Sequence, residues 1–160
     1  MMKIKPRGVA IVTGAAGGMG SASAARLAAQ GWALILCDIS EERLEQTAAP
    51  LRAAAQSIEI LAGNIADASF SAALLAILKD RPIGAVIHTA GLSPTMGDAA
   101  QILAVNYDAT SRLLELVRPR MLEGACAVLM ASSSGYAAVS PEIDAVLDAI
   151  PPGEIGRAHV

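Results

Sequence analysis

The chain has 160 residues, a net charge of −3 and a high apolar fraction that includes very few aromatic residues. This length suits one domain with a sizeable core, and the acidic balance argues against nucleic acid or an anionic membrane as a partner. The apolar residues are chiefly Ala, Leu, Ile and Val, which suits β-strands covered by close-packed helices.

The two cysteines, Cys37 and Cys126, lie inside apolar, strand-like runs. We therefore expect two buried free thiols in a reducing cytosol, and their spacing predicts no metal site. Too few apolar residues follow the basic start of the chain for a signal peptide, and no later run reaches membrane-spanning length. These features indicate a cytoplasmic protein without a membrane partner.

A glycine-rich stretch near the amino end is the strongest motif. The β-branched run from Val9 to Thr13 is followed by five glycines and alanines and then by an Ala-rich segment, Ser21 to Gln30, that reads as a helix ending at Gly31. Glycines allow a sharp turn, and the free N–H groups at the start of a helix attract anionic oxygens. The pattern predicts a phosphate-binding loop formed by Gly14, Ala16, Gly17, Gly18, Met19 and Gly20.

An acidic residue completes the nucleotide pattern. Asp38 and Ile39 close a second apolar run that starts at Trp32. A carboxylate at the end of the second strand can accept hydrogen bonds from the ribose hydroxyls of an adenine dinucleotide. The simpler interpretation, a glycine turn with an unrelated surface Asp, is disfavoured by the order strand, loop, helix, strand and acid.

The rest of the chain alternates in the same way. Ser40 is the expected start of the next helix, and Asp98 with Gln101 resembles a capping box at the start of a helix that runs toward Pro119. The expected later elements are helices 40–50, 70–78 and 98–118 and strands 58–62, 85–88 and 125–130. This order predicts an α/β fold, a Rossmann-type doubly wound parallel sheet with about five strands, whose ligands bind at the carboxyl ends of the strands.

These motifs together resemble those of the short-chain dehydrogenase/reductase family. The stretch from Thr13 to Gly20 matches the family's T-G-x-x-x-G-x-G loop, and Asp38 matches the acidic residue of its NAD-preferring members. The remaining matched positions are Asn64 and Ile65, where the family usually has Asp-Val against the adenine, and Thr89, Ala90 and Gly91, which resemble the end of its N-N-A-G element after His88.

The resemblance implies hydride transfer between a nicotinamide ring and an alcohol or carbonyl carbon of a small molecule, with NAD preferred over NADP. Asn106 falls where the family has its catalytic Asn, and Ser133 where it has its catalytic Ser, which hydrogen-bonds the substrate oxygen. The family commonly forms homo-oligomers, partly through the helix that carries Asn106.

The sequence departs from the family after Ser133. The family's Tyr-x-x-x-Lys pair is absent, because the only tyrosines are Tyr107 and Tyr136 and no lysine follows either one. We therefore interpret residues 1–150 as a partial dinucleotide-binding domain, the amino-terminal fragment of a longer protein, and 151–160 as a non-native tail. We expect the chain alone to be inactive and prone to aggregate.

Two other functions stay open on the sequence alone. Gly14, Gly17 and Gly20 also fit the T-G-x-x-G-x-x-G loop of the extended branch, whose members carry out epimerisation or dehydration of nucleotide sugars. The absence of the Tyr and Lys pair is instead compatible with a non-catalytic dinucleotide-binding module that senses redox state.

Overall fold

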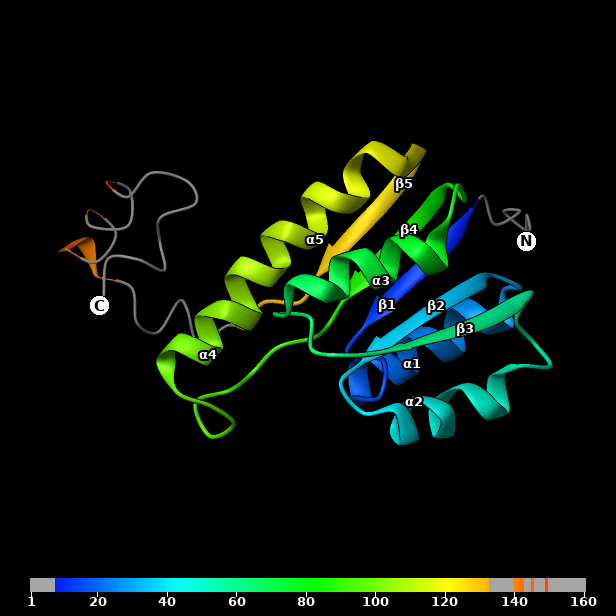
Figure 1. Ribbon diagram of the computed structural model, residues 1–160, viewed down its shortest axis with the longest axis horizontal. Coiled ribbons are helices and arrows are strands. Elements are labelled where there is room, and N and C mark those ends of the chain that lie inside the picture. Colours follow the sequence, from blue (N-terminus) through cyan, green and yellow to red (C-terminus); the bar gives the residue numbers. More distant parts are fainter. Residues whose placement is uncertain (1–7, 133–139, 143–144, 146–148, 150–160) are drawn as a thin grey trace.

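A five-stranded parallel sheet with the strand order β3-β2-β1-β4-β5 forms the centre of the computed structural model, which describes residues 8–132, 140–142, 145 and 149. The strands are β1 Val9–Thr13, β2 Ala33–Asp38, β3 Ser57–Ala62, β4 Ile83–His88 and β5 Met121–Leu129. The α-helices are α1 Gly18–Ala29, α2 Glu41–Ala48, α3 Ala68–Leu78, α4 Ala99–Leu103 and α5 Ala109–Val117. The predicted doubly wound α/β fold is confirmed (Figure 1).

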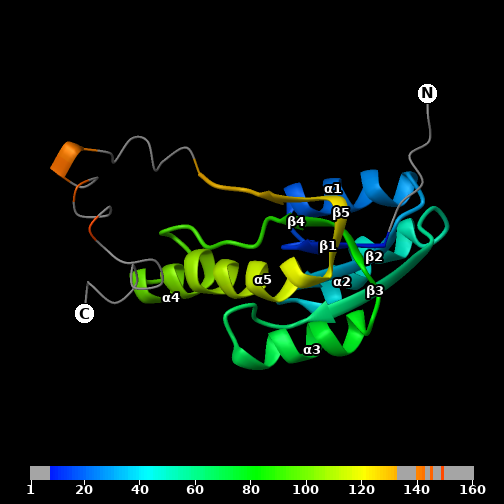
Figure 2. The same ribbon diagram turned by 90° about the horizontal axis from the view of Figure 1, so that it is seen from above.

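Helices cover both faces of the sheet, and Figure 2 shows α1 and α3 on opposite sides of it. Alternate residues of the central strands supply the two cores, because successive side chains of a strand point to opposite faces. Ile11 and Ile35 pack with α3 and α5, whereas Val12 and Leu36 pack with α1 and α2. None of the helices in the described part of the chain is both long and apolar enough to span a bilayer.

Helix α1 begins at Gly18, three residues before the predicted start at Ser21. Gly20, in the first turn of this helix, lies close to the preceding loop, because a Cβ there would lie 2.1 Å from the Gly14 carbonyl oxygen. The glycines therefore belong partly to the helix, and its first turn rests directly on the loop. The predicted stop at Gly31 is confirmed, since Gly31 has a φ of +76° and its N–H donates to the Ala28 carbonyl.

The helix predicted from Asp98 toward Pro119 has two breaks in its geometry. The capping box is confirmed, because Asp98 Oδ1 accepts from the Gln101 N–H at 2.8 Å and Gln101 Oε1 accepts from the Asp98 N–H at 3.0 Å. A π-helical turn, Ala104–Asp108, then separates α4 from α5, and a 3₁₀ turn, Arg118–Arg120, follows. Hydrophobic spacing alone did not reveal the π-helical turn, which often marks a functional site.

The prediction that Cys126 is buried was wrong. Its strand, β5, begins at Met121 rather than Ala125, lies at the edge of the sheet and pairs irregularly with β4 around Gly124, whose φ is +77°. Cys126 is exposed there, whereas Cys37 in the central strand β2 is buried as predicted. An apolar run therefore indicated the strand correctly but not its burial, which depends on the layers that cover it.

The close contact between Gly20 of α1 and the glycine loop predicts how substitutions in the first turn of α1 affect stability. Gly20→Ala should lower the free energy of unfolding by about 2 kcal/mol or more, because the new methyl group meets backbone that has little room to move. Gly18→Ala, where a Cβ meets nothing within 4 Å, should change stability by about 1 kcal/mol or less. Urea unfolding of the two variants checks this, and equal midpoints would contradict it.

Candidate cofactor-binding site

A cavity of about 650 Å³ opens at the carboxyl ends of β1, β2, β3 and β4. One wall comes from the glycine loop and the end of β2, and another from the turn before α3. The opposite wall comes from the loop after β4 and from the start of the following helix. The lining residues are Thr13, Gly14, Gly17, Cys37, Asp38, Ile39, Arg43, Gly63, Asn64, Ile65, Ala66, Phe70, Thr89, Ala90, Gly91, Leu92, Met96, Gln101, Ala104 and Val105.

The glycine loop has the geometry that a phosphate group requires. Gly14 has a φ of +66°, and a Cβ there would lie 2.7 Å from the Ala90 backbone nitrogen, so only glycine fits. Helix α1 starts at the loop, and its N-cap residue is Gly17, which has no side chain to cap the first N–H groups. The first N–H groups of α1 are therefore available to an anion, and the helix dipole favours negative charge at this end.

Asp38 is held beside the glycine loop. Its Oδ2 accepts from the Ala16 N–H at 3.0 Å, and its Oδ1 accepts a longer bond from the Ser40 N–H at 3.4 Å. Arg43 reaches back from α2, and its Nη2 donates to the Ala16 carbonyl at 2.8 Å. The peptide groups of Ala16 thus join the loop to a carboxylate and a guanidinium, both on the rim of the cavity.

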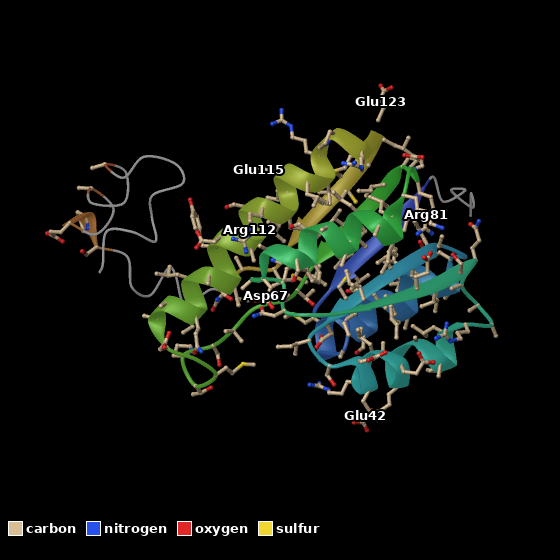
Figure 3. The ribbon with its side chains drawn as sticks, viewed as in Figure 1. Glu42, Asp67, Arg81, Arg112, Glu115 and Glu123 are labelled. Atoms are coloured by element: carbon tan, nitrogen blue, oxygen red, sulfur yellow. The ribbon has the colours of Figure 1, made fainter. Side chains whose placement is uncertain are left out.

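The turn between β3 and α3 forms a second wall, where Asn64 and Ile65 line the cavity. Asn64 Oδ1 accepts from the Ala66 N–H at 3.0 Å, so this side chain shapes the turn. Arg112 points from α5 toward the start of α3, near the labelled Asp67 in Figure 3, and its Nη2 donates to the Ala66 carbonyl at 2.8 Å. Ile39, whose side chain is exposed, adds apolar surface at the end of β2. Ile39 and Ile65 give the cavity apolar surface against which a flat aromatic base can pack.

The end of β4 is tied to the end of β1. Thr89 Oγ1 donates to the Thr13 carbonyl at 2.8 Å, and the Thr89 N–H donates to the same oxygen at 3.1 Å. Thr89, Ala90 and Gly91 all line the cavity. His88, just before them, is buried and contacts two threonine hydroxyls.

Two groups at the base of the site have shifted pKa values. Burial, with a smaller contribution from the Asp38 charge, raises the pKa of the Cys37 thiol to about 12, so the thiol stays protonated and unreactive at neutral pH. Burial also lowers the pKa of His88 below its usual 6.5, which favours the neutral imidazole. Among the described residues, no three His, Cys, Asp or Glu side chains gather to hold a metal ion.

Asn106 lies in the π-helical turn, and its side-chain amide makes two hydrogen bonds to the loop after β4. Its Oδ1 accepts from the Leu92 N–H at 2.7 Å, and its Nδ2 donates to the Leu92 carbonyl at 2.9 Å. The side chain therefore fixes the backbone just beyond Gly91. The other predicted catalytic residue, Ser133, lies outside the described residues, as do Tyr136 and the predicted tail 151–160.

The structure brings most of the predicted cofactor-binding residues to one cavity. Gly14, Gly17, Asp38 and Ile39 line it together with Asn64, Ile65, Thr89, Ala90 and Gly91. The other four, Ala16, Gly18, Met19 and Gly20, belong to the loop and the first turn of α1 and are not among the lining residues.

Sequence reasoning missed the helical wall and one charged group. Leu92, Met96, Gln101, Ala104 and Val105 form the wall, and Arg43 adds a guanidinium to the rim. The sequence predicted a helix over 98–118, which includes Val105, but not that this part of the helix lines the cavity. Arg43 had one usable signal, its position one turn after the helix start at Ser40.

The lowered pKa of His88 predicts the pH dependence of stability. Below pH 6.5 the unfolded chain takes up a proton on this histidine that the folded chain resists, so this contribution to stability is complete above 6.5 and lost as the pH falls toward the lowered value. Chemical unfolding at several pH values should show a steeper loss on acidification for the wild type than for His88→Gln. Carboxylates titrate in both proteins, so equal slopes would contradict the prediction.

The chain is similar in sequence to known proteins of one enzyme family. The family model for short chain dehydrogenase matches residues 8–143. A short-chain reductase protein, NovJ, from Streptomyces niveus is 33% identical over 118 residues, 68% of this chain and 45% of that protein. D-threitol dehydrogenase from Mycolicibacterium smegmatis is 33% identical over 146 residues, 84% of this chain and 56% of that protein. The chain thus spans about half the length of these two relatives.

Solved structures show the same similarity. A ketone-specific alcohol dehydrogenase from Comamonas testosteroni has a TM-score of 0.70 and 25% identity, with 85% of this chain and 57% of that chain covered. A short-chain dehydrogenase from Sphingobium yanoikuyae in complex with NADPH has a TM-score of 0.70 and 28% identity, with 81% and 55% covered. Together with the family match, these similarities confirm the resemblance seen in the motifs: the chain belongs to the short-chain dehydrogenase/reductase family.

Proposed function

We propose that this chain is the cofactor-binding part of an NAD(H)-dependent oxidoreductase that interconverts an alcohol and a carbonyl. The observation that carries the proposal is the Asp38 carboxylate held against the Ala16 N–H beside an uncapped helix start. An anion site and a ribose acceptor thus lie on one cavity rim, as a dinucleotide requires. The names of the relatives, which include a reductase and dehydrogenases, support alcohol and carbonyl chemistry over the chemistry of nucleotide sugars.

Each part of the cavity has a role in this proposal. The N–H groups at the start of α1 bind the pyrophosphate, and Asp38 accepts from the ribose hydroxyls of the adenosine half. The adenine packs between Ile39 and the turn of Asn64 and Ile65, which Arg112 supports from α5. When bound, the nicotinamide supplies the hydride donor or acceptor.

Asn106 acts on this site as a positioning residue. The oxygen and the nitrogen of its side-chain amide each bond the Leu92 backbone, so it orders the loop after Gly91. By resemblance to the family, Ser133 hydrogen-bonds the substrate oxygen. The intact protein is proposed to be a homo-oligomer acting on a small molecule, in keeping with the family.

Asp38 is proposed to set the preference for NAD over NADP. Similar structures from other organisms were solved with either nucleotide, so family membership alone leaves this preference open. A carboxylate repels the 2′-phosphate of NADP and accepts from the hydroxyl that NAD has there. Arg43 is the positive group on the same rim, but its Nη2 is engaged with the Ala16 carbonyl.

The variant Asp38→Asn tests this preference. It keeps an oxygen for the Ala16 N–H but removes the charge, and it leaves Arg43 as the charged group of the rim. The ratio of NADPH to NADH dissociation constants should fall by about tenfold or more. Fluorescence titration of the chain with each reduced dinucleotide measures the ratio.

The control for this variant is Glu41→Gln, which makes the same change of charge at an exposed position in the first turn of α2. It should leave the ratio of dissociation constants at the wild-type value. An unchanged ratio in Asp38→Asn, or an equal change in Glu41→Gln, would count against Asp38 as the discriminating group.

The chain by itself is proposed to bind the dinucleotide without turning over an alcohol. The family's proton-transferring Tyr and its Lys partner have no counterpart in this sequence. Incubation of the chain with NAD and a panel of secondary alcohols should therefore give no NADH absorbance above background. Measurable alcohol-dependent NADH formation would contradict this expectation.

A non-catalytic dinucleotide-binding module is the second candidate function, and it requires that no Tyr-x-x-x-Lys pair follows these 160 residues in the protein. Both candidates predict dinucleotide binding by this chain. The gene sequence past codon 160 separates them, because an oxidoreductase requires an in-frame Tyr-x-x-x-Lys there.

A further inference from the structure

His88 connects three elements at the base of the cofactor cavity. It ends β4 with only 3% of its surface exposed, and it lies opposite Thr13 in the pairing of β4 with β1. Its Nδ1 is 2.7 Å from Thr13 Oγ1, and its Nε2 is 2.7 Å from Thr110 Oγ1 on α5. Both ring nitrogens are therefore used, one toward the glycine loop and one toward the helix that follows Asn106.

The positions of the protons in this chain of contacts follow from counting donors. Thr110 has one hydroxyl proton, which it donates to the Asn106 carbonyl at 2.9 Å. Thr110 Oγ1 must therefore accept from His88, so Nε2 carries the imidazole proton. A neutral ring then leaves a lone pair on Nδ1, to which the Thr13 hydroxyl donates.

The other neutral tautomer fits less well. With the proton on Nδ1, the Thr13 oxygen would accept from His88 and from the Ala90 N–H, which lies 3.4 Å away. The buried Thr13 hydroxyl proton would then be left without an acceptor at this junction. The Thr110 hydroxyl would have to donate to His88 Nε2 and would lose its hydrogen bond to the Asn106 carbonyl. The Nε2–H form instead gives one continuous direction of donation, from Ala90 through Thr13, His88 and Thr110 to Asn106.

This chain of hydrogen bonds joins two walls of the cavity. Thr13 directly precedes Gly14 of the phosphate loop, and both residues line the cavity. Thr110 follows the π-helical turn by two residues, and that turn contributes Ala104 and Val105 to the opposite wall. The distance between the glycine loop and the helical wall is thus held by a buried imidazole with a fixed tautomer.

We propose that His88, fixed as the Nε2–H tautomer between Thr13 and Thr110, is a positioning residue that couples the glycine loop to the π-helical turn of Asn106. The position of the Leu92 backbone depends on this coupling. Thr110 donates to the Asn106 carbonyl, and the Asn106 side-chain amide in turn bonds the Leu92 backbone. The inference rests on the proposed function only where it concerns dinucleotide affinity.

The tautomer is tested directly by a long-range ¹H–¹⁵N correlation spectrum of histidine-labelled chain. The sequence has two histidines, His88 and His159, so His159→Gln assigns the signals. Wild type should show His88 with its proton on Nε2 and an unprotonated Nδ1 near neutral pH. A spectrum with the proton on Nδ1, or with averaged nitrogen shifts, would overturn the proposal.

The coupling is tested by Thr110→Val, which keeps the β-branched shape and removes the hydroxyl. Hydrogen exchange of the Leu92 amide should become about threefold to tenfold faster, the range that corresponds to the net free energy of one hydrogen bond. Thr110→Ser retains the hydroxyl and should behave as wild type. Thr47→Val is the matched control, since Thr47 donates to the Arg43 carbonyl four residues back at 3.0 Å in α2.

Dinucleotide affinity supplies a second readout of the coupling. NADH should bind Thr110→Val about threefold to tenfold more weakly than wild type, and Thr110→Ser and Thr47→Val should bind normally. If wild type binds no NADH, the proposed function fails, whereas the tautomer and the Leu92 exchange still decide the coupling. Unchanged Leu92 exchange in Thr110→Val overturns the coupling whatever the affinity.

Discussion

Two close approaches between backbone segments, both at glycines, organise the whole site. Gly20, in the first turn of α1, sits against the Gly14 carbonyl, and Gly14 in turn sits against the backbone of Thr89 and Ala90. Side chains at these two glycines would push apart the first strand, the first helix and the fourth strand. Their absence lets the start of α1 lie directly beside the glycine loop at the edge of the cavity, where its N–H groups and dipole favour an anion.

Hydrogen bonds from side chains to backbone then fix the loops around that point. Asp38 accepts from the Ala16 N–H, and Arg43 donates to the Ala16 carbonyl. Arg112 bonds the turn after β3, and Asn106 bonds the Leu92 backbone. Most of these bonds join residues far apart in the sequence, so each loop is anchored to a different secondary-structure element. The cavity can in this way be largely formed before a ligand arrives, which lowers the cost of ordering on binding.

Much of this arrangement could be predicted from the sequence, because the relevant signals are local. The glycine loop, the acid after the second strand and the capping box at Asp98 each reflect chemistry within a few residues. The edge position of Cys126, the π-helical turn at Asn106 and the cavity wall at Val105 could not be predicted in this way. They depend on which layer covers a strand and on how a helix docks, and hydrophobic spacing records only that a face is apolar.

The proposed function requires that the glycine loop and Asp38 bind a dinucleotide. Isothermal titration calorimetry of this chain with NAD and, separately, with NADP measures this binding. We expect one molecule of NAD bound per chain, with NADP bound more weakly. The absence of binding heat with both dinucleotides, for a chain whose circular dichroism shows that it is folded, would contradict it.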